Sequence, residues 1–177
     1  MDVVALPLAG LLLVKPRVFR DARGFFVETF SAEPYRQAGI DVTFVQDNHS
    51  RSTHGTVRGM HFQTTPGQAK LVRAATGRIF DVAVDIRPGS PTFGRWHGEI
   101  LDAESHHQLF VPIGFAHGFC VLSDHADVAY KVSSPYVGAT ESGFAWNDPE
   151  VGIAWPVEAP IISQRDQDAR PLREVIR

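Results

Sequence analysis

QDNHSRSTHGTVRGMHFQTTPGQAK, residues 46–70, is the stretch around which the rest of this chain is organised. It concentrates cationic, imidazole and amide side chains in a short span, among them Arg58, His61 and Lys70. Within it, the run VRGMHFQ from Val57 to Gln63 interleaves strand-forming apolar residues with polar ones. A surface strand would turn such polar groups toward water, whereas a strand lining a concave pocket would point them at a ligand. We interpret this run as a strand in the wall of a binding pocket.

The composition predicts one globular domain over residues 1–177. Hydrophobic residues make up 44% and charged residues 21%, which is ordinary for a protein with its own core. The net charge of −3 offers no bulk attraction to a nucleic-acid backbone, so we expect no nucleic-acid partner. The single Cys120 excludes an internal disulfide and suits a reducing compartment. The apolar segment 1–16 lacks a basic leader and is interrupted by two prolines, so we expect no signal peptide, no membrane partner and a cytoplasmic protein.

Short segments rich in β-branched and aromatic residues follow one another along the chain, separated by Gly, Pro, Asp and Ser. The expected strands are 57–63, 71–75, 79–86, 98–101, 108–111, 118–122 and 126–132. Upstream, residues 11–19 and 25–30 read as a hairpin around a turn at 21–24. Residues 31–38 read as a short helix that Ser31 caps and Gly39 ends. This pattern predicts an all-β fold, a β-sandwich closed into a jelly roll with the pocket inside, rather than a parallel α/β fold.

Two spaced motifs point to a particular jelly roll. Five residues separate Gly55 from His61, and the later run PIGFAH, which ends at His117, has the form P-x-G-x-x-H. Together these resemble the two motifs of the cupin superfamily. Metal-binding cupins continue the first motif with further ligands where this chain has Gln63 and Gln68, and neutral amides are poor ligands for transition metals. We therefore expect no metal site.

An imidazole, an ammonium and a phenol remain for chemistry: His61, Lys70 and Tyr130. In the expected strand 126–132, Tyr130 shares a face with Val128 and should point into the barrel. A pocket with a base, a fixed positive charge and a second proton donor suits proton abstraction next to a carbonyl group. From spacing alone, Lys70 also fits a solvated lysine at a strand edge, and Tyr130 a plain core aromatic.

The resemblance to one family is closer. The segments QDNHSRS, VRGMHFQ, QAKLVRAATG, IFDVAVDIRPGSPTFGRWHGEIL, LFVPIGFAHGFCVLSD, VAYK, WNDPEVGIAWP and ISQRD are similar, in order, to the dTDP-4-dehydrorhamnose 3,5-epimerases, over about residues 10–166. The resemblance implies a cupin-fold homodimer that uses neither metal nor cofactor. Its substrate would be a dTDP-4-keto-6-deoxyhexose in deoxysugar biosynthesis.

The resemblance also implies roles for individual residues. His61 would be the general base, oriented by Asp166, with Lys70 steadying the enolate and Tyr130 as general acid. The residues implied to bind the substrate are Phe19, Arg23, Glu28, Gln46, Asn48, Arg58, His117, Tyr136 and Arg165, with Phe19 and Tyr136 flanking the base partly across the dimer interface. Arg165 departs from the family's usual Lys beside Asp166, which puts the local arrangement in doubt.

Several other interpretations stay open. His61 could be a satisfied interior histidine, and Asp166 could only close a capping box with Ser163. In a regular strand Arg58 and His61 point to opposite faces, so both reach one pocket only if Gly59 permits a bulge or the arginine reaches around. The rival functions are an epimerase acting at C3 or C5 alone, a metal-dependent cupin enzyme, and a jelly roll that binds sugar without catalysis. The N-terminal segment could add to the sheet of a dimer partner.

Overall fold

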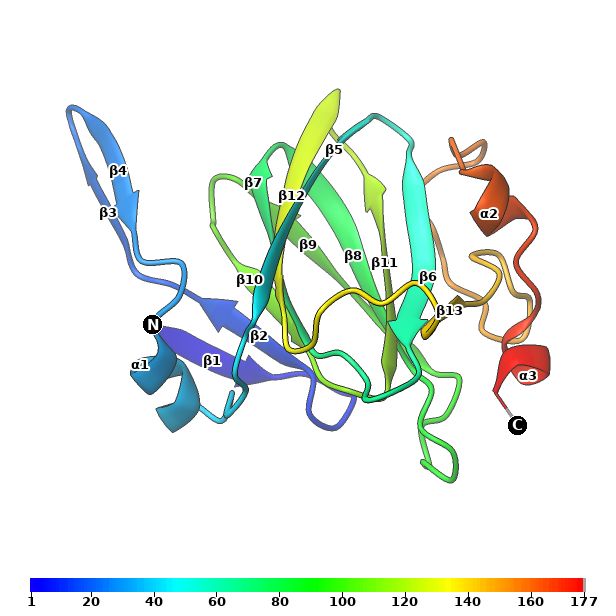
Figure 1. Cartoon of the computed structure of the whole chain (residues 1–177). Helices are drawn as coiled ribbons and strands as arrows, with labels where there is room; N and C mark the ends of the chain where they lie inside the picture. The colour runs from blue at the N-terminus through cyan, green and yellow to red at the C-terminus, as the bar shows by residue number, and fades with distance from the viewer. Residues whose placement is uncertain (177) are drawn as a thin grey trace.

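The computed structural model describes residues 1–176, which form two antiparallel sheets packed face to face (Figure 1). The six-stranded sheet runs in the order β1 (Asp2–Ala5), β2 (Leu12–Lys15), β10 (Gln108–Val111), β7 (Lys70–Thr76), β12 (His125–Val132) and β5 (Gln46–Thr53). The five-stranded sheet runs β13 (Glu141–Gly143), β6 (Val57–Gln63), β11 (Phe115–Val121), β8 (Arg78–Asp85) and β9 (Trp96–Asp102). The expected cupin-type β-sandwich is confirmed, and each expected strand is present with ends shifted by at most three residues.

The apolar core lies between the two sheets. Val72, Leu109 and Val128 from the six-stranded sheet pack with Ile79 and Phe119 from the five-stranded sheet. Tyr130 packs against this cluster while remaining only partly buried. The core therefore fills one part of the interior and stops at Tyr130, where polar side chains begin.

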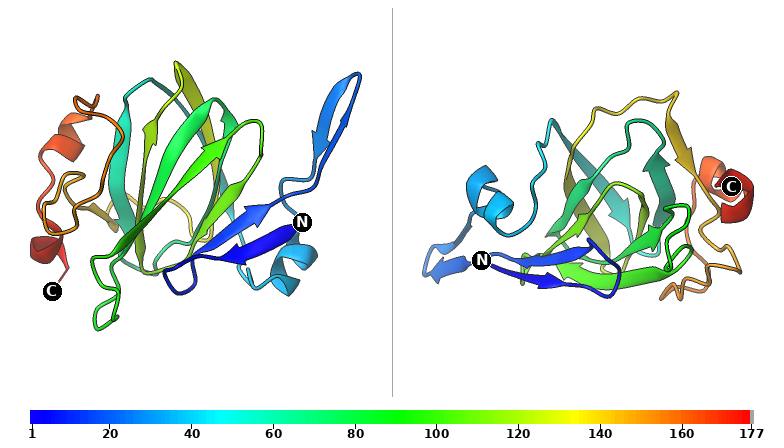
Figure 2. Two further views of the ribbon diagram at one scale, coloured as in Figure 1. Left: turned by 180° about the vertical axis from the view of Figure 1, so that it is seen from behind. Right: turned by 90° about the horizontal axis from the view of Figure 1, so that it is seen from below.

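Both sheets also bury their outer faces. The C-terminal segment crosses the outside of the five-stranded sheet (Figure 2), where Phe144 and Leu172 cover Met60 and Val82. This segment contains α2 (Gln164–Gln167) and α3 (Leu172–Val175). On the other side, helix α1 (Ala32–Gln37) covers the six-stranded sheet with the buried Tyr35. Because β8 is covered on both faces, its side chains are held in place from two directions.

Helix α1 fits its prediction except at its cap. It spans one residue less at each end than expected, and Gly39 follows it with a φ of +95°. Ser31 occupies the N-cap position, but its side chain makes no capping hydrogen bond. The helix is held instead by Tyr35, whose hydroxyl donates to Gln108 Oε1 at 3.0 Å. In the described chain, no helix has the length and apolar character needed to cross a bilayer.

The predicted hairpin of residues 11–19 and 25–30 is wrong in extent. Pro16 lacks the N–H that a continuous strand needs, so the chain breaks there and β2 joins the six-stranded sheet. The hairpin that forms is shorter: β3 (Val18–Asp21) pairs with β4 (Gly24–Val27) and projects away from the sandwich (Figures 1 and 2). Its phenylalanines Phe19, Phe25 and Phe26 are exposed, so they do not belong to the core between the two sheets.

Candidate active site

A cavity of about 500 Å³ opens between the two sheets. Its walls contain seven of the predicted site residues: Arg58, His61, Lys70, His117, Tyr130, Arg165 and Asp166. They come from β6, β7, β11, β12 and α2, which are far apart in the sequence. The volume lies within the usual range for small-molecule sites, and both basic and acidic side chains line the cavity.

His61 and Asp166 form a hydrogen-bonded pair in this cavity. The distance from His61 Nε2 to Asp166 Oδ1 is 2.6 Å, and Asp166 is buried while the imidazole is partly accessible. Burial alone would raise the pKa of Asp166, but the hydrogen bond and charge of His61 and the Gly59 amide together lower it. An ionised Asp166 keeps the proton of His61 on Nε2 and leaves Nδ1 as the basic nitrogen. The pair thus has the arrangement of an oriented general base.

Asp166 also sits in the helix start that the sequence predicted. Ser163 is the N-cap of α2, and its Oγ accepts a hydrogen bond from the Asp166 amide at 3.2 Å. The Asp166 side chain does not close the capping box, because its two oxygens face His61 and the Gly59 amide. The cap therefore holds the backbone while the carboxylate serves the cavity.

The bulge proposed at Gly59 is present. His61 pairs with His117 and Arg58 with Phe119, so the register between β6 and β11 shifts by one residue over this interval. Gly59 has a φ of +137°, and a Cβ on it would lie 2.7 Å from the Gly118 Cα. The bulge turns Arg58 and His61 to the same cavity.

Lys70 and His117 line the cavity from β7 and β11. Lys70 is nearly inaccessible to solvent, and burial lowers its pKa to about 8 although the charges of Asp81 and Glu141 oppose the shift. His117 Nε2 lies 2.9 Å from Asp81 Oδ1, and both side chains are buried. Burial lowers the pKa of His117 despite this carboxylate. The site thus holds a neutral imidazole and an ammonium that titrates close to neutral pH.

Tyr130 faces the cavity from β12, as its position in the strand predicted. Burial raises the pKa of its phenol, while the charge of Arg58 and a hydrogen bond with Asn48 partly offset the shift. Asn48 accepts in turn from Gln46 Nε2 at 2.8 Å. These two predicted binding residues belong to β5, which was not predicted as a strand because its sequence is polar. Every second side chain of β5 faces inward, and Ser52 Oγ accepts from Arg58 Nε at 2.9 Å.

Sequence reasoning missed Glu141, which lines the cavity at the start of β13. Its Oε2 accepts from Arg165 Nη1 at 2.7 Å and from the Tyr136 hydroxyl at 2.9 Å. Burial opposes the shift, but these two hydrogen bonds lower the pKa of Glu141. The unusual Arg165 thus binds Glu141 and leaves the contact between His61 and Asp166 intact. Asp81 was likewise assigned no role, although a carboxylate within the apolar strand β8 was a signal.

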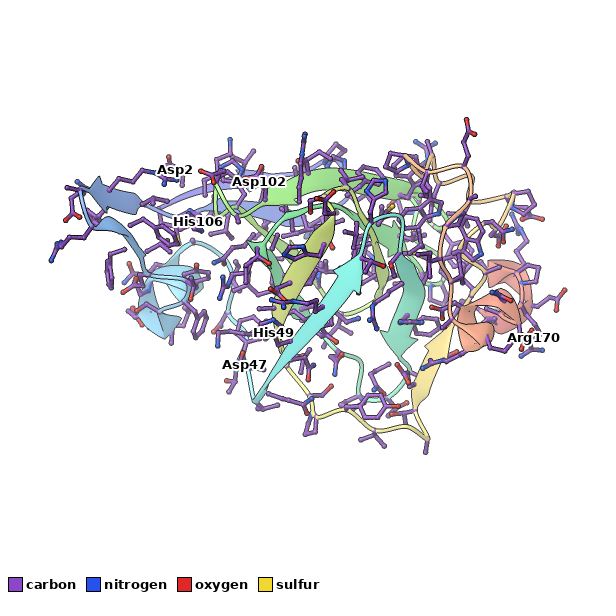
Figure 3. All side chains as sticks on the ribbon, turned by 90° about the horizontal axis from the view of Figure 1, so that it is seen from above. Asp2, Asp47, His49, Asp102, His106 and Arg170 are labelled. Carbon is purple, nitrogen blue, oxygen red and sulfur yellow. The ribbon has the colours of Figure 1, made fainter. Side chains whose placement is uncertain are left out.

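Six predicted residues do not line the cavity of their own chain: Gln46, Asn48 and Tyr136 are linked to its walls by hydrogen bonds, and three others lie apart from it. Phe19 and Arg23 are on the projecting hairpin, and Glu28 directly follows it. Arg23 is exposed and pairs with Asp21, Nη2 to Oδ2 at 2.6 Å. The hairpin touches the rest of the chain near its turn, where the centre of the Phe25 ring lies 4.4 Å from that of the His106 ring, which Figure 3 labels. Within one chain, nothing brings these three side chains to His61.

The amides at the former metal-ligand positions turn to other partners. Gln63 Oε1 accepts from Thr140 Oγ1 at 2.6 Å, and Gln68 Nε2 donates to the Ser134 carbonyl at 2.8 Å. Among residues 1–176, no three His, Cys, Asp or Glu side chains are grouped as they would be around a metal ion.

The fold and the site together define a cupin-type β-sandwich whose cavity carries acid–base side chains. The family model of dTDP-4-dehydrorhamnose 3,5-epimerase matches residues 5–174. The chain belongs to this family of isomerases.

Individual relatives agree with this placement. The chain is 52% identical to a dTDP-4-dehydrorhamnose 3,5-epimerase of Neisseria gonorrhoeae, over 94% of this chain but only 51% of that protein. It is 50% identical to one of Shigella flexneri, over 94% and 93% of the two chains. It is 42% identical to a dTDP-4-dehydrorhamnose 3-epimerase of Streptomyces niveus, over 98% and 85%. Among solved structures, a 3,5-epimerase of Legionella pneumophila in complex with dTDP-4-keto-L-rhamnose superposes with a TM-score of 0.94 at 44% identity, over 97% and 93%.

Proposed function

We propose that this protein epimerises dTDP-4-keto-6-deoxy-D-glucose at C3 and C5, in the biosynthesis of dTDP-L-rhamnose or a related deoxysugar. The observation that carries the proposal is the placement of base and acid. His61, held by Asp166, belongs to the five-stranded sheet, whereas Tyr130 belongs to the six-stranded sheet that faces it. A sugar ring held between these walls presents one face to the imidazole and the other to the phenol. Inversion of a carbon requires two such groups.

Each inversion then has two balanced steps. His61 removes the proton from a carbon next to the C4 ketone, and the electron pair moves onto the ketone oxygen to form an enolate. The Lys70 ammonium stabilises this negative charge, and the burial of Lys70 strengthens the interaction. Tyr130 then delivers a proton to the opposite face of the carbon, and exchange with solvent restores both side chains. C3 and C5 both flank the ketone, so one set of residues serves both carbons.

The remaining predicted residues are assigned to binding. Arg58 and Arg165 supply positive charge at the cavity for the diphosphate-linked substrate, and His117 supplies a neutral imidazole. Asn48 and Gln46 act from β5, where Asn48 contacts Tyr130. Tyr136 lies at the edge of the site through its bond to Glu141.

The active unit in this proposal is a homodimer. The hairpin of β3 and β4 exposes Phe19, Phe25 and Phe26, and an isolated two-stranded hairpin is only marginally stable in water. A partner subunit would cover these rings, and the same contact would carry Arg23 and Glu28 to the partner's cavity. β1 pairs with β2 of its own chain and forms the edge of its sheet, so it too is available to a partner. The lone, buried Cys120 supports the proposed cytoplasmic location.

The proposal is tested by incubating the protein with dTDP-4-keto-6-deoxy-D-glucose in D₂O and locating deuterium by NMR. Incorporation at both C3 and C5 is the expected result. Deuterium at C3 alone would show the narrower activity named for the Streptomyces niveus relative. Binding without incorporation at either carbon would contradict catalysis. Metal analysis belongs beside it, because one tightly bound ion per chain, with activity lost on chelation, would favour a metal-dependent mechanism.

A further inference from the structure

Residues 133–140, here named the rim loop, connect β12 in one sheet to β13 in the other (Figure 1). The loop carries Tyr136 and leads directly into Glu141, whose carboxylate lines the cavity. Tyr136 and Val137 are exposed, so little apolar burial holds the middle of the loop. Its position therefore depends on hydrogen bonds from neighbouring segments.

The first part of the loop is bound by residues 67–69. The Ala69 amide donates to Ser133 Oγ at 2.8 Å, and Ser134 Oγ donates to the Gly67 carbonyl at 2.9 Å. Gln68 Nε2 completes the set with its bond to the Ser134 carbonyl at 2.8 Å. Together with the bond from the Ser133 amide to the Ala69 carbonyl at 3.1 Å, four hydrogen bonds fix the point at which the loop leaves β12.

The middle and the end of the loop are bound by two other glutamines. The Tyr136 amide donates to Gln46 Oε1 at 3.1 Å. Thr140 Oγ1 donates to the buried Gln63 Oε1 at 2.6 Å. Neither Gln63 nor Gln68 lines the cavity, so both act on the loop.

The neutral amide at each position has a chemical reason. Gln68 must donate to a carbonyl, which a carboxylate cannot do. Gln63 lies directly opposite Glu141 in the pairing of β6 with β13. A carboxylate at position 63 would place two like charges across the ladder, which destabilises the pair. The Gln63 side chain accepts the hydrogen bond from the Thr140 hydroxyl without that repulsion.

We propose that Gln63 and Gln68 are positioning residues that fix the rim loop, with Tyr136 and Glu141, as a wall of the active site. At the two positions where metal-binding cupins have metal ligands, this chain has glutamines whose side chains hydrogen-bond the rim loop. The inference rests on the proposed function for its kinetic consequence, but the fixing of the loop can be measured without any substrate.

The test uses Gln63→Met and Gln68→Met, which keep side-chain length and remove the hydrogen bond. The matched control is Gln37→Met, which removes a hydrogen bond from the side-chain amide of Gln37 to Glu33 on the surface of α1. Hydrogen exchange is followed at the Tyr136, Thr140 and Glu141 amides in the full-length protein, together with kcat, KM and the affinity for dTDP. We expect exchange at these amides to become about 10-fold faster, the effect of losing one net hydrogen bond, and kcat to fall about 5-fold to 10-fold. Exchange in β8 and dTDP affinity should stay unchanged.

Two further variants address the same bond from the loop side. Thr140→Val removes the donor to Gln63 and should reproduce the effect even if Gln63→Met does not fold, whereas Thr140→Ser keeps the hydroxyl and should retain at least half of kcat. The proposal is overturned if loop exchange stays at the wild-type rate in both glutamine variants, or if exchange accelerates while kcat is unchanged. An equal loss of kcat in Gln37→Met would overturn it too. Failure of the epimerase assignment would show separately, as absence of deuterium incorporation by the unmodified protein.

Discussion

The cavity and the β3–β4 hairpin are built on opposite principles. Three acid–base groups in the cavity have a hydrogen-bonded charged partner within the same chain: Asp166 for His61, Asp81 for His117 and Arg165 for Glu141. The hairpin leaves its large apolar rings in water, and Phe26 is 68% exposed. The comparison shows that one chain holds all the groups to which the proposed mechanism assigns proton transfer, whereas the hairpin residues proposed to bind substrate do not line the cavity of their own chain.

The sharpest way to break this comparison is to remove the base. His61→Ala should lower kcat by about 1,000-fold or more, because a positioned base contributes about that much. It should also abolish deuterium incorporation while leaving dTDP affinity nearly intact, measured by NMR and calorimetry. Wild-type rates of deuterium incorporation in this variant would place the chemistry elsewhere.

Replacing the acid tests the opposite wall. Tyr130→Phe should lower product formation by about 100-fold, since proton delivery to the second face is lost. Deuterium exchange should fall much less, because His61 can still remove and return a proton on its own side. The two rates are compared by NMR in D₂O, and equal losses in both would remove the acid role from Tyr130.

The hairpin is tested by complementation between subunits. Arg23→Ala should raise KM about 10-fold, as expected for the loss of a charged contact to the substrate, with less effect on kcat. His61→Ala should be nearly inactive by itself. Co-expressed and purified together, the two variants should recover about a quarter of wild-type activity at low substrate concentration. Random pairing makes half the dimers mixed, and each mixed dimer has one intact site.

The absence of any recovery of activity in the co-expressed mixture would contradict a site shared between subunits. If the mixture shows only the averaged activity of the two variants, Arg23 serves its own chain or no site at all. Light scattering on the wild-type protein gives the independent control, because a monomeric protein at assay concentration would exclude the shared site.

The pH dependence of the reaction tests the charge of Lys70. Burial lowers the pKa of Lys70 to about 8, so its ammonium is present below that pH and is lost as the pH rises through it. Activity should therefore fall on the alkaline side, to about half at the apparent pKa and about tenfold for each further pH unit. A kcat profile that stays flat to pH 9.5 would contradict a need for the charged lysine.

The local sequence pattern predicted most strands well, because the alternation of apolar and polar residues lies within each strand itself. The alternation in Val57–Gln63 and in residues 126–132 depends only on which side of a sheet is buried, and both segments form strands as expected. The opposite parity of Arg58 and His61 left two possibilities, a bulge at Gly59 or an arginine that reaches around, and the structure shows the bulge. β5 escaped because its inward face is polar, and a strand that lines a cavity lacks the apolar alternation by which strands are detected.

Contacts between residues far apart in the sequence cannot be predicted from such local patterns. His61 and Asp166 are 105 residues apart, and only the family resemblance linked them. The carboxylate of Asp81 stood out within an apolar strand, but nothing in its own segment, or in that of Glu141, indicates that His117 or Arg165 is its partner.

The sequence by itself determined an all-β sandwich, the residues able to move protons, and the absence of the usual ligands at the metal positions of kindred folds. Only the tertiary structure decided that Asp81 faces His117 and Arg165 binds Glu141, that Gln63 and Gln68 bind the rim loop, and that the hairpin stands clear of its own cavity. The reason is that side-chain periodicity encodes inside and outside for each strand, whereas contacts across the sandwich arise only when strands from distant parts of the chain are brought face to face.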